Sequence, residues 1–168
     1  MHHIYVMGRN SMDIAAAKKI AAKLISFKMH TCREVYQKLL RKGCDEQTAE
    51  ETVAEFCKAG ILDDAEYAKA YIHDATAIGF KGMYRIKQEL LAKGIASSVI
   101  DKAAMESDID VKQQLKNYVE VRFADKVFED YKDIEKVKAH LMRRGYNISD
   151  INKCFKELNI TISRGDID

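Results

Sequence analysis

The chain repeats itself with a period of 51 residues. A motif of apolar residues, basic residues and a glycine recurs as Leu39-Leu40-Arg41-Lys42-Gly43, Leu90-Leu91-Ala92-Lys93-Gly94 and Leu141-Met142-Arg143-Arg144-Gly145. The register extends beyond the motif, because Cys32, Met83 and Ile134 occupy equivalent positions. A repeat of this length is one supersecondary unit that cannot bury its apolar face alone. We therefore expect the 168 residues to form several units that stack on one another.

The residue pattern within each unit is that of amphipathic helices. In the middle copy, Met83, Ile86 and Leu90 place apolar side chains at i, i+3 and i+7, which is one face of a helix. The glycine after each motif can end its helix in a left-handed conformation, and the basic residue before it suits the negative helix end. The residues placed to cap helix starts are Thr31, Asp45, Ser97 and Asn147. With no proline to interrupt these helices, the sequence predicts an all-α protein.

The repeats predict a tandem array of three-helix units. We place the first unit at residues 12–59, the second at 63–110 and the third at 114–161. Residues 1–11 are then an N-terminal extension, and residues 162–168 are a tail. We expect the units to stack into an elongated array, curved or straight.

Composition indicates a folded protein of the cytoplasm. Apolar residues make up 47% of the chain and charged residues 32%, which is typical of a globular domain. No export signal and no apolar run approaching the ~20 residues needed to cross a bilayer are found. We therefore expect a cytoplasmic protein with no membrane association. The four cysteines form no Cys-x-x-Cys pair, and we interpret them as reduced packing residues.

No arrangement of reactive side chains predicts a catalytic, metal or cofactor site. Asp63 and Asp64 could be paired catalytic carboxylates or part of a metal site, but the spacing from Asp63 to Glu66 favours helix capping. The five histidines form no His-Glu-x-x-His motif, and no Gly-x-Ser-x-Gly nucleophile motif occurs. We expect no catalytic residue, no metal, no cofactor and no enzymatic activity.

Basic residues at regular intervals are the candidate partner-binding groups. Their 51-residue spacing suits a repetitive acidic partner. Gly79 and Gly82 lie beside Lys81 and Arg85, and this segment is either a hinge between units or a cradle for an anion at a helix start, two compatible interpretations. The candidate partner-binding residues are Arg41, Lys42, Lys81, Arg85, Lys93, Arg143 and Arg144, and the candidate hinge residues are Gly79 and Gly82.

Three features together resemble the RecX family of regulatory proteins. They are the triple motif, the stretch Gly60-Ile61-Leu62-Asp63-Asp64-Ala65-Glu66-Tyr67-Ala68, and Gly79-x-x-Gly82 leading into Arg85-Ile86-Lys87-Gln88-Glu89-Leu90-Leu91-Ala92-Lys93-Gly94-Ile95. The resemblance covers roughly residues 15–158 and is most specific in the middle unit. The family often has a proline where this chain has Met83, but proline there would only preset the start of a helix.

The resemblance implies a non-enzymatic protein that binds filaments of the RecA recombinase on single-stranded DNA. Such proteins are thought to limit filament growth, ATP hydrolysis and strand exchange, and so to regulate DNA repair, recombination and the SOS response. A tandem array with recurring charged ends can contact several protomers at once and gain affinity by multivalency. We expect this protein to act as a monomer.

A direct nucleic-acid-binding helical-repeat protein is the alternative. Short three-helix units resemble helix-turn-helix bundles, and one helix per unit could enter a groove of DNA. Proteins that hold DNA chiefly through its phosphates are usually strongly basic, whereas this chain has a net charge of +2. Weak direct contact with DNA is compatible with binding to a RecA filament, and an enzyme is the least favoured class.

Overall fold

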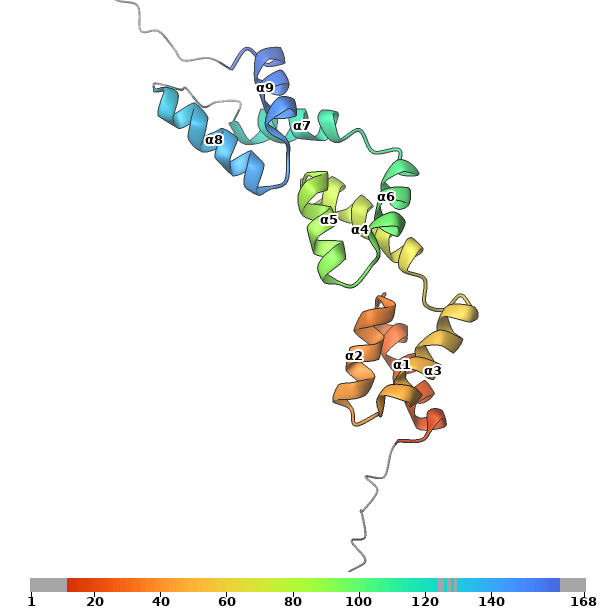
Figure 1. Ribbon diagram of the computed structural model, residues 1–168. Helices are drawn as coiled ribbons and strands as arrows, with labels where there is room; N and C mark the ends of the chain where they lie inside the picture. The colour runs from red at the N-terminus through yellow and green to blue at the C-terminus, as the bar shows by residue number, and fades with distance from the viewer. Residues whose placement is uncertain (1–11, 124–125, 127, 129, 161–168) are drawn as a thin grey trace, which may run out of the picture. The chain divides into compact units, whose positions relative to one another are not determined.

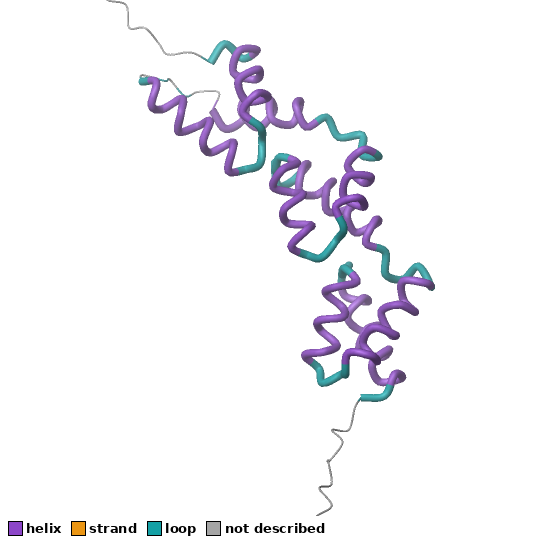
Figure 2. The backbone as a smooth tube through the Cα atoms, in the orientation of Figure 1, coloured by secondary structure: helices purple, strands orange, loops and turns teal. Residues whose placement is uncertain are grey.

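The computed structural model describes residues 12–123, 126, 128 and 130–160. The regular structure in these residues is helical and includes no strand, which confirms the predicted fold class (Figures 1 and 2). The helices of the described residues are α1 (Ile14–Phe27), α2 (Cys32–Arg41), α3 (Glu46–Lys58), α4 (Asp64–Ala77), α5 (Met83–Ala92), α6 (Ser97–Met105), α7 (Val111–Phe123), α8 (Tyr131–Arg143) and α9 (Ile148–Glu157).

Most of the predicted helix caps are present. The Thr31 hydroxyl accepts a hydrogen bond from the Glu34 amide at 3.1 Å, and the Glu34 carboxylate accepts one from the Thr31 amide at 3.2 Å. This is a complete capping box at the start of α2. Asp45 and Asn147 likewise cap α3 and α9. The prediction for Ser97 is wrong, because Ser97 is already the first residue of α6 and its hydroxyl bonds to a carboxylate one turn along the helix.

The glycine after each repeated motif ends its helix as predicted. Gly43, Gly94 and Gly145 have φ angles of +92°, +89° and +95°, in a left-handed region that most residues with a Cβ atom avoid. After α2, the amides of Gly43 and Cys44 donate to carbonyls of the last helical turn at 2.9 and 3.1 Å. The helix end is therefore hydrogen-bonded although the helix has stopped.

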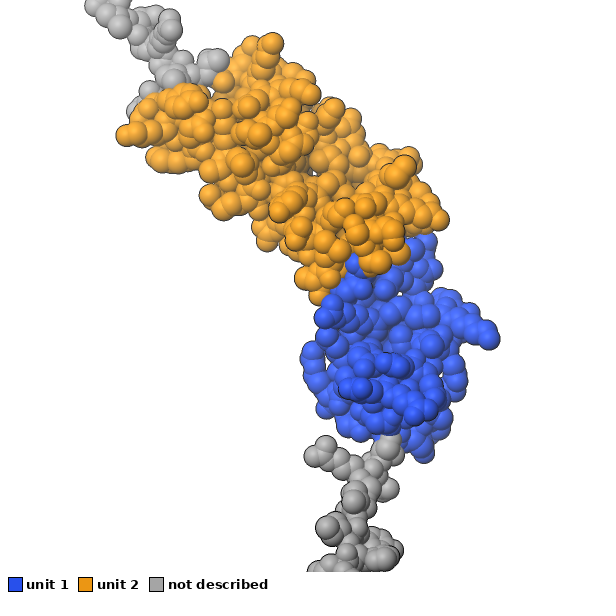
Figure 3. Space-filling model, viewed as in Figure 1, with its two compact units in different colours: residues 1–67, 93–95 blue, residues 68–92, 96–168 orange. Residues whose placement is uncertain are grey.

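The contacts divide the chain into two compact units, coloured blue and orange in Figure 3. Unit 1 comprises the described residues up to Tyr67 together with Lys93–Ile95. Its core lies where α1, α2 and α3 pack on one another. The buried residues of that core are Ala17, Ala21, Val35, Leu39, Cys44, Ala49 and Leu62. The small alanines allow α1 and α3 to approach closely, while Val35, Leu39 and Leu62 are the largest aliphatic side chains of this core.

Unit 2 comprises Ala68–Ala92 and the described residues from Ala96 onward. One core cluster of unit 2 is formed by α7, α8, α9 and the segments before and after α8. Its buried residues are Leu115, Val119, Phe128, Ile134, Val137, Leu141, Tyr146, Ile151, Cys154 and Phe155. Residues of α4, α5 and α6 are also buried, namely Ile72, Ile86, Leu90, Ile100 and Ala103. The predicted units at 12–59, 63–110 and 114–161 stay a prediction. The contacts divide the chain into two compact units and place Lys93–Ile95, from the predicted second unit, in unit 1.

Candidate partner-binding surface

Lys93, a candidate partner-binding residue, is held inside unit 1. Its Nζ lies 2.6 Å from the Glu34 carboxylate and 5.5 Å from the centre of the Tyr67 ring. Its carbonyl oxygen accepts a hydrogen bond of 2.9 Å from the Thr31 hydroxyl. The hydrogen bond with Glu34 raises the pKa of Lys93, although burial acts in the opposite direction. Lys93 is therefore charged and engaged at the start of α2.

Arg144 makes the corresponding contact inside unit 2. Its guanidinium donates to the carbonyl oxygen of Phe80 at 3.1 Å and to that of Gly79, and lies 4.7 Å from the centre of the Tyr118 ring. Its own carbonyl oxygen accepts a hydrogen bond of 2.8 Å from the Gly82 amide. Cation–π contacts of this kind contribute roughly 0.5–2 kcal/mol, depending on their exposure.

The contacts of Lys93 and Arg144 are copies of one another at the repeat spacing. Lys93 and Arg144 are 51 positions apart, as are Tyr67 and Tyr118. In each case the cation lies over the tyrosine ring, and its carbonyl oxygen accepts a bond from the residue just before a helix, first at the start of α2 and then at the start of α5. The repeat in the sequence therefore encodes a repeated packing contact.

Lys81 and Arg85 are both engaged with Glu89. The carboxylate of Glu89 lies 2.7 Å from Lys81 Nζ and 3.0 Å from Arg85 Nε, and accepts a hydrogen bond of 2.6 Å from the Tyr71 hydroxyl. Burial favours the neutral form of Glu89, but the hydrogen bonds from Lys81, Tyr71 and Arg85 outweigh it and lower its pKa to about 2. The predicted anion cradle beside Lys81 therefore already contains a carboxylate of this chain.

The two candidate hinge glycines lie in close contact with backbone atoms of unit 2. A Cβ atom on Gly79 would lie 2.7 Å from the carbonyl oxygen of Ala75, and one on Gly82 would overlap the backbone of Gly145. Both contacts would be shorter than the contacts that Cβ atoms make in real proteins. The hinge stays a prediction, but both positions have a direct steric requirement for glycine.

Arg41, Lys42 and Arg143 differ from the other candidates. All three side chains are exposed and form no ion pair or side-chain hydrogen bond with any residue in the described ranges. Lys42 occupies the same motif position as Lys93 and Arg144, yet a Cβ atom on the neighbouring Gly43 would meet no atom within 4 Å. The motif of the first repeat is therefore open where the other two are packed.

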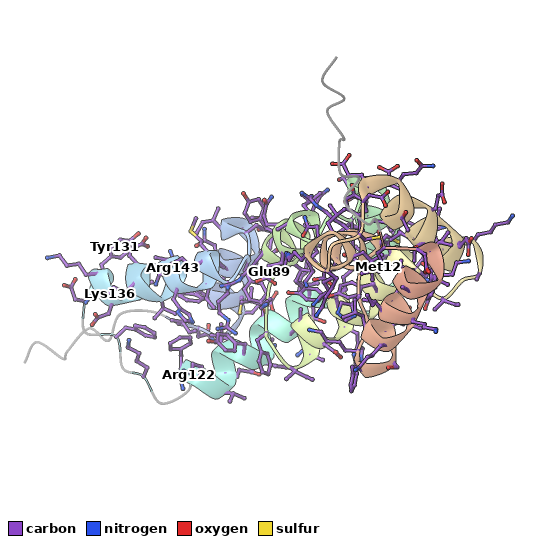
Figure 4. All side chains as sticks on the ribbon, turned by 90° about the horizontal axis from the view of Figure 1, so that it is seen from below. Met12, Glu89, Arg122, Tyr131, Lys136 and Arg143 are labelled. Carbon is purple, nitrogen blue, oxygen red and sulfur yellow. The ribbon has the colours of Figure 1, made fainter. Side chains whose placement is uncertain are left out.

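A basic cluster in unit 2 was not predicted as a site. Arg122, Lys126 and Lys136 line a shallow pocket with His140 between α7 and α8. Arg143 lies one turn beyond His140 on α8, and Figure 4 labels it together with Arg122 and Lys136. Burial lowers the pKa of His140, and the positive charges of nearby arginines, including Arg143 and Arg122, lower it further. The helical spacing of positions 136, 140 and 143 could have indicated this face, but Arg122 and Lys126 lie outside the repeated motif.

The two acidic residues at the start of α4 have structural partners. Asp63 accepts hydrogen bonds from the amides of Ala65 and Glu66 at 2.8 and 3.1 Å, which confirms the capping prediction. Asp64 accepts one from the Cys32 amide at 2.9 Å.

Over the described residues, no group of three His, Cys, Asp or Glu side chains is placed to hold a metal ion. No helix in those ranges combines the length and apolarity that crossing a membrane requires.

Tandem helical units with a repeated packing contact define a helical-repeat protein of the three-helix type. Two family models match the chain, "RecX, first three-helix domain" at residues 17–56 and "RecX, second three-helix domain" at residues 63–103. The chain belongs to the RecX family of regulatory proteins, which confirms the resemblance identified in the sequence.

Individual relatives agree with this assignment. Regulatory protein RecX of Vibrio campbellii is 33% identical over 137 residues, which are 82% of this chain and 88% of the relative. Regulatory protein RecX of Pectobacterium atrosepticum is 37% identical over 111 residues, 64% of this chain and 68% of the relative. The fold is similar to the crystal structure of RecX from Lactobacillus salivarius, with a TM-score of 0.74, 22% identity, and coverage of 88% of this chain and 97% of that chain.

Proposed function

We propose that this protein binds the RecA filament on single-stranded DNA and inhibits its growth, ATP hydrolysis and strand exchange. It acts in the cytoplasm as a monomer and without catalysis of its own, and so regulates DNA repair and recombination. Membership of the RecX family is the observation that carries this proposal. The tandem construction also supports it, because repeated units can contact successive subunits of a polymer.

The free basic side chains are the proposed contact points with the filament. Arg41, Lys42 and Arg143 are exposed and have no charged partner among the described residues, so they can pair with acidic groups of a protein without first breaking an internal bond. Lys93 and Arg144 instead hold packing contacts in their own units. We assign these two residues a positioning role.

ATP hydrolysis by RecA on single-stranded DNA, measured while this protein is titrated in, tests the proposal. The wild type should suppress hydrolysis at less than one molecule per RecA subunit. The double variant Arg41→Glu and Lys42→Glu should need about tenfold more protein for half-maximal inhibition. Its matched control is Lys19→Glu with Lys23→Glu, the same charge change on exposed residues of α1. Equal inhibition by both double variants would reject the Arg41–Lys42 surface, and no inhibition by the wild type would reject the function.

Direct nucleic-acid binding is a second candidate, supported by the basic cluster between α7 and α8. Binding of a labelled single-stranded oligonucleotide, measured at several salt concentrations, would test it, because affinity for phosphates falls steeply as salt rises. The variant Arg122→Glu with Lys136→Glu should then lose DNA binding. If this variant loses both DNA binding and inhibition of RecA, competition for DNA explains the inhibition. If it loses DNA binding alone, the filament remains the partner.

A further inference from the structure

Two of the four cysteines lie against each other in unit 1. Cys32 is the first residue of α2, and Cys57 lies in the last turn of α3. Their Sγ atoms are 3.0 Å apart, about 1 Å more than the length of a disulfide bond. Both side chains are partly exposed, so a small oxidant dissolved in water can reach them.

Packing of α2 on α3 creates this pair. Cys32 and Cys57 are 25 positions apart in the chain, and no short motif connects them. Cys44 lies between them in the sequence but is buried, and Cys154 is buried in unit 2. All four are free thiols in the structure. Of the four cysteines, all of which lie in the described ranges, only Cys32 and Cys57 are in direct contact with each other.

We propose that Cys32 and Cys57 form a peroxide-sensitive dithiol that closes to an intramolecular disulfide. In the first step one thiol loses its proton, and hydrogen peroxide accepts two electrons from the resulting thiolate, which becomes a sulfenic acid. The hydroxide that leaves the peroxide takes up a proton and is released as water. In the second step the other thiol attacks the sulfenic sulfur, the S–S bond forms, and the hydroxyl group leaves as water. Two thiols and one peroxide therefore give one disulfide and two water molecules.

The surroundings of Cys32 disfavour its thiolate form. Burial raises the pKa of Cys32, and the hydrogen bond with Cys57 and the negative charge of Asp64 raise it further. Because the thiolate is the reactive form, Cys32 is a poor target for peroxide near neutral pH. Disulfide formation should consequently become faster as the pH is increased.

The bond would connect the start of α2 to the end of α3. A cross-link across 25 positions removes many conformations from the unfolded chain. We expect the melting temperature of the oxidised protein to rise by roughly 5 °C or more. Thr31 and Glu34 at the start of α2 bind Lys93. The disulfide would therefore also stabilise the helix end that Lys93 contacts.

The experiment uses the full chain, reduced, freed of reductant and exposed to hydrogen peroxide for increasing times at several pH values. After quenching with catalase, free thiols are alkylated and the intact mass is measured. The wild type should become two hydrogen masses lighter and take up two alkyl groups in place of four. Dithiothreitol should restore the reduced mass. Each of Cys32→Ser and Cys57→Ser should prevent this change.

Cys44→Ser is the matched control, because it removes the third thiol of unit 1 and should leave disulfide formation intact. Thermal unfolding tests whether each variant is folded. If Cys32→Ser does not fold, Cys32→Ala replaces it in the experiment. The proposal is overturned if four thiols of the wild type remain alkylatable, if disulfide-linked dimers form in place of the internal bond, or if the bond is lost in Cys44→Ser and kept in Cys57→Ser. None of these results depends on RecA, so they are separate from the proposed function.

Discussion

Replacing Gly82 with alanine distinguishes a flexible hinge from a close-packed contact. Gly82 directly precedes α5 in unit 2, and its amide donates a 2.8 Å hydrogen bond to the carbonyl oxygen of Arg144. An added methyl group would overlap the backbone of Gly145. Because a backbone segment cannot rotate away as the end of a flexible side chain can, the two loops must move apart.

The free-energy change can be worked out from the bonds that this movement disturbs. They include the Gly82 bond to Arg144, the Tyr84 amide bond to Gly145 at 3.3 Å, and the guanidinium bonds of Arg144 to two carbonyl oxygens. A neutral hydrogen bond contributes about 1 kcal/mol and a charged one about 1.5–3 kcal/mol. Weakening part of this set predicts a destabilisation of about 2–4 kcal/mol.

A hinge predicts the opposite sign for the same substitution. Gly82 does not have a left-handed φ angle, so alanine is compatible with its backbone conformation. At such a position, replacing glycine with alanine stabilises a protein by roughly 0.4–1 kcal/mol, because the unfolded chain loses conformational freedom. The sign of the change therefore separates the two interpretations without any measurement of molecular shape.

Urea unfolding of the full chain measures that sign. With a slope of about 2 kcal/mol per molar urea, the predicted loss lowers the unfolding midpoint by about 1–2 M. Amide hydrogen exchange provides a local measurement, since the amides of residue 82 and Tyr84 should exchange faster in the variant. Gly43→Ala is the control, because Gly43 has a φ of +92° but no atom within 4 Å of a new methyl group, which predicts a loss of only about 1 kcal/mol. An unchanged or raised midpoint for Gly82→Ala, with its amides still protected, would refute the close-packing argument.

Three further predictions follow from the contacts of individual residues. Glu89 has a pKa lowered from 4.5 to about 2, because three side-chain hydrogen bonds outweigh the effect of burial. Glu89 should therefore stabilise the fold by about 3 kcal/mol above pH 4.5, and this contribution should disappear as the pH falls through 2. Urea midpoints of wild type and Glu89→Gln, measured between pH 7 and about 2, should therefore converge in acid, and a constant difference would contradict this. Lys93→Met should lower the free energy of unfolding by about 1–2 kcal/mol, because an ion pair and a cation–π contact are lost. Lys42→Met should change it by less than about 0.5 kcal/mol, and equal effects of the two substitutions would show that the internal contact of Lys93 contributes nothing. Ile86→Ala should lower the unfolding free energy by about 2–5 kcal/mol in thermal or urea unfolding, because Ile86 is fully buried, while Ile78, which is 76% exposed, provides a neutral isoleucine-to-alanine control.

The helices and their ends were predictable because their signals are local. The capping box of Thr31 and Glu34 depends on residues three positions apart, and the left-handed turn at Gly43 depends on the preceding helical turn. Ser97 shows the limit of such signals, because a shift of one residue in the start of α6 moves its hydroxyl out of the capping position. Local patterns place a helix reliably and its first residue less so.

The roles of the basic residues were not predictable from their motif. Lys42 and Lys93 occupy the same position in the repeat. Lys93 pairs with Glu34, which is 59 positions away in the chain, and Lys42 has no such partner among the described residues. In the same way, the sequence around Lys81 and Arg85 predicted an anion cradle, and the structure shows that Glu89 of the same chain pairs with both cations. A motif specifies charge at a helix end and not the group that will neutralise it.

The amino-acid sequence alone therefore determines the helical class, the 51-residue repeat, the positions of the left-handed glycines and membership of the RecX family. Only the tertiary structure decides which cations remain free, why Gly82 has no room for a side chain, and which two thiols meet. The physical reason is the range of the interactions. Helix formation and capping depend on residues within about four positions of one another, whereas Cys32 contacts Cys57 across 25 positions and Arg144 contacts Phe80 across 64. Contacts of that range form only when helices pack against one another.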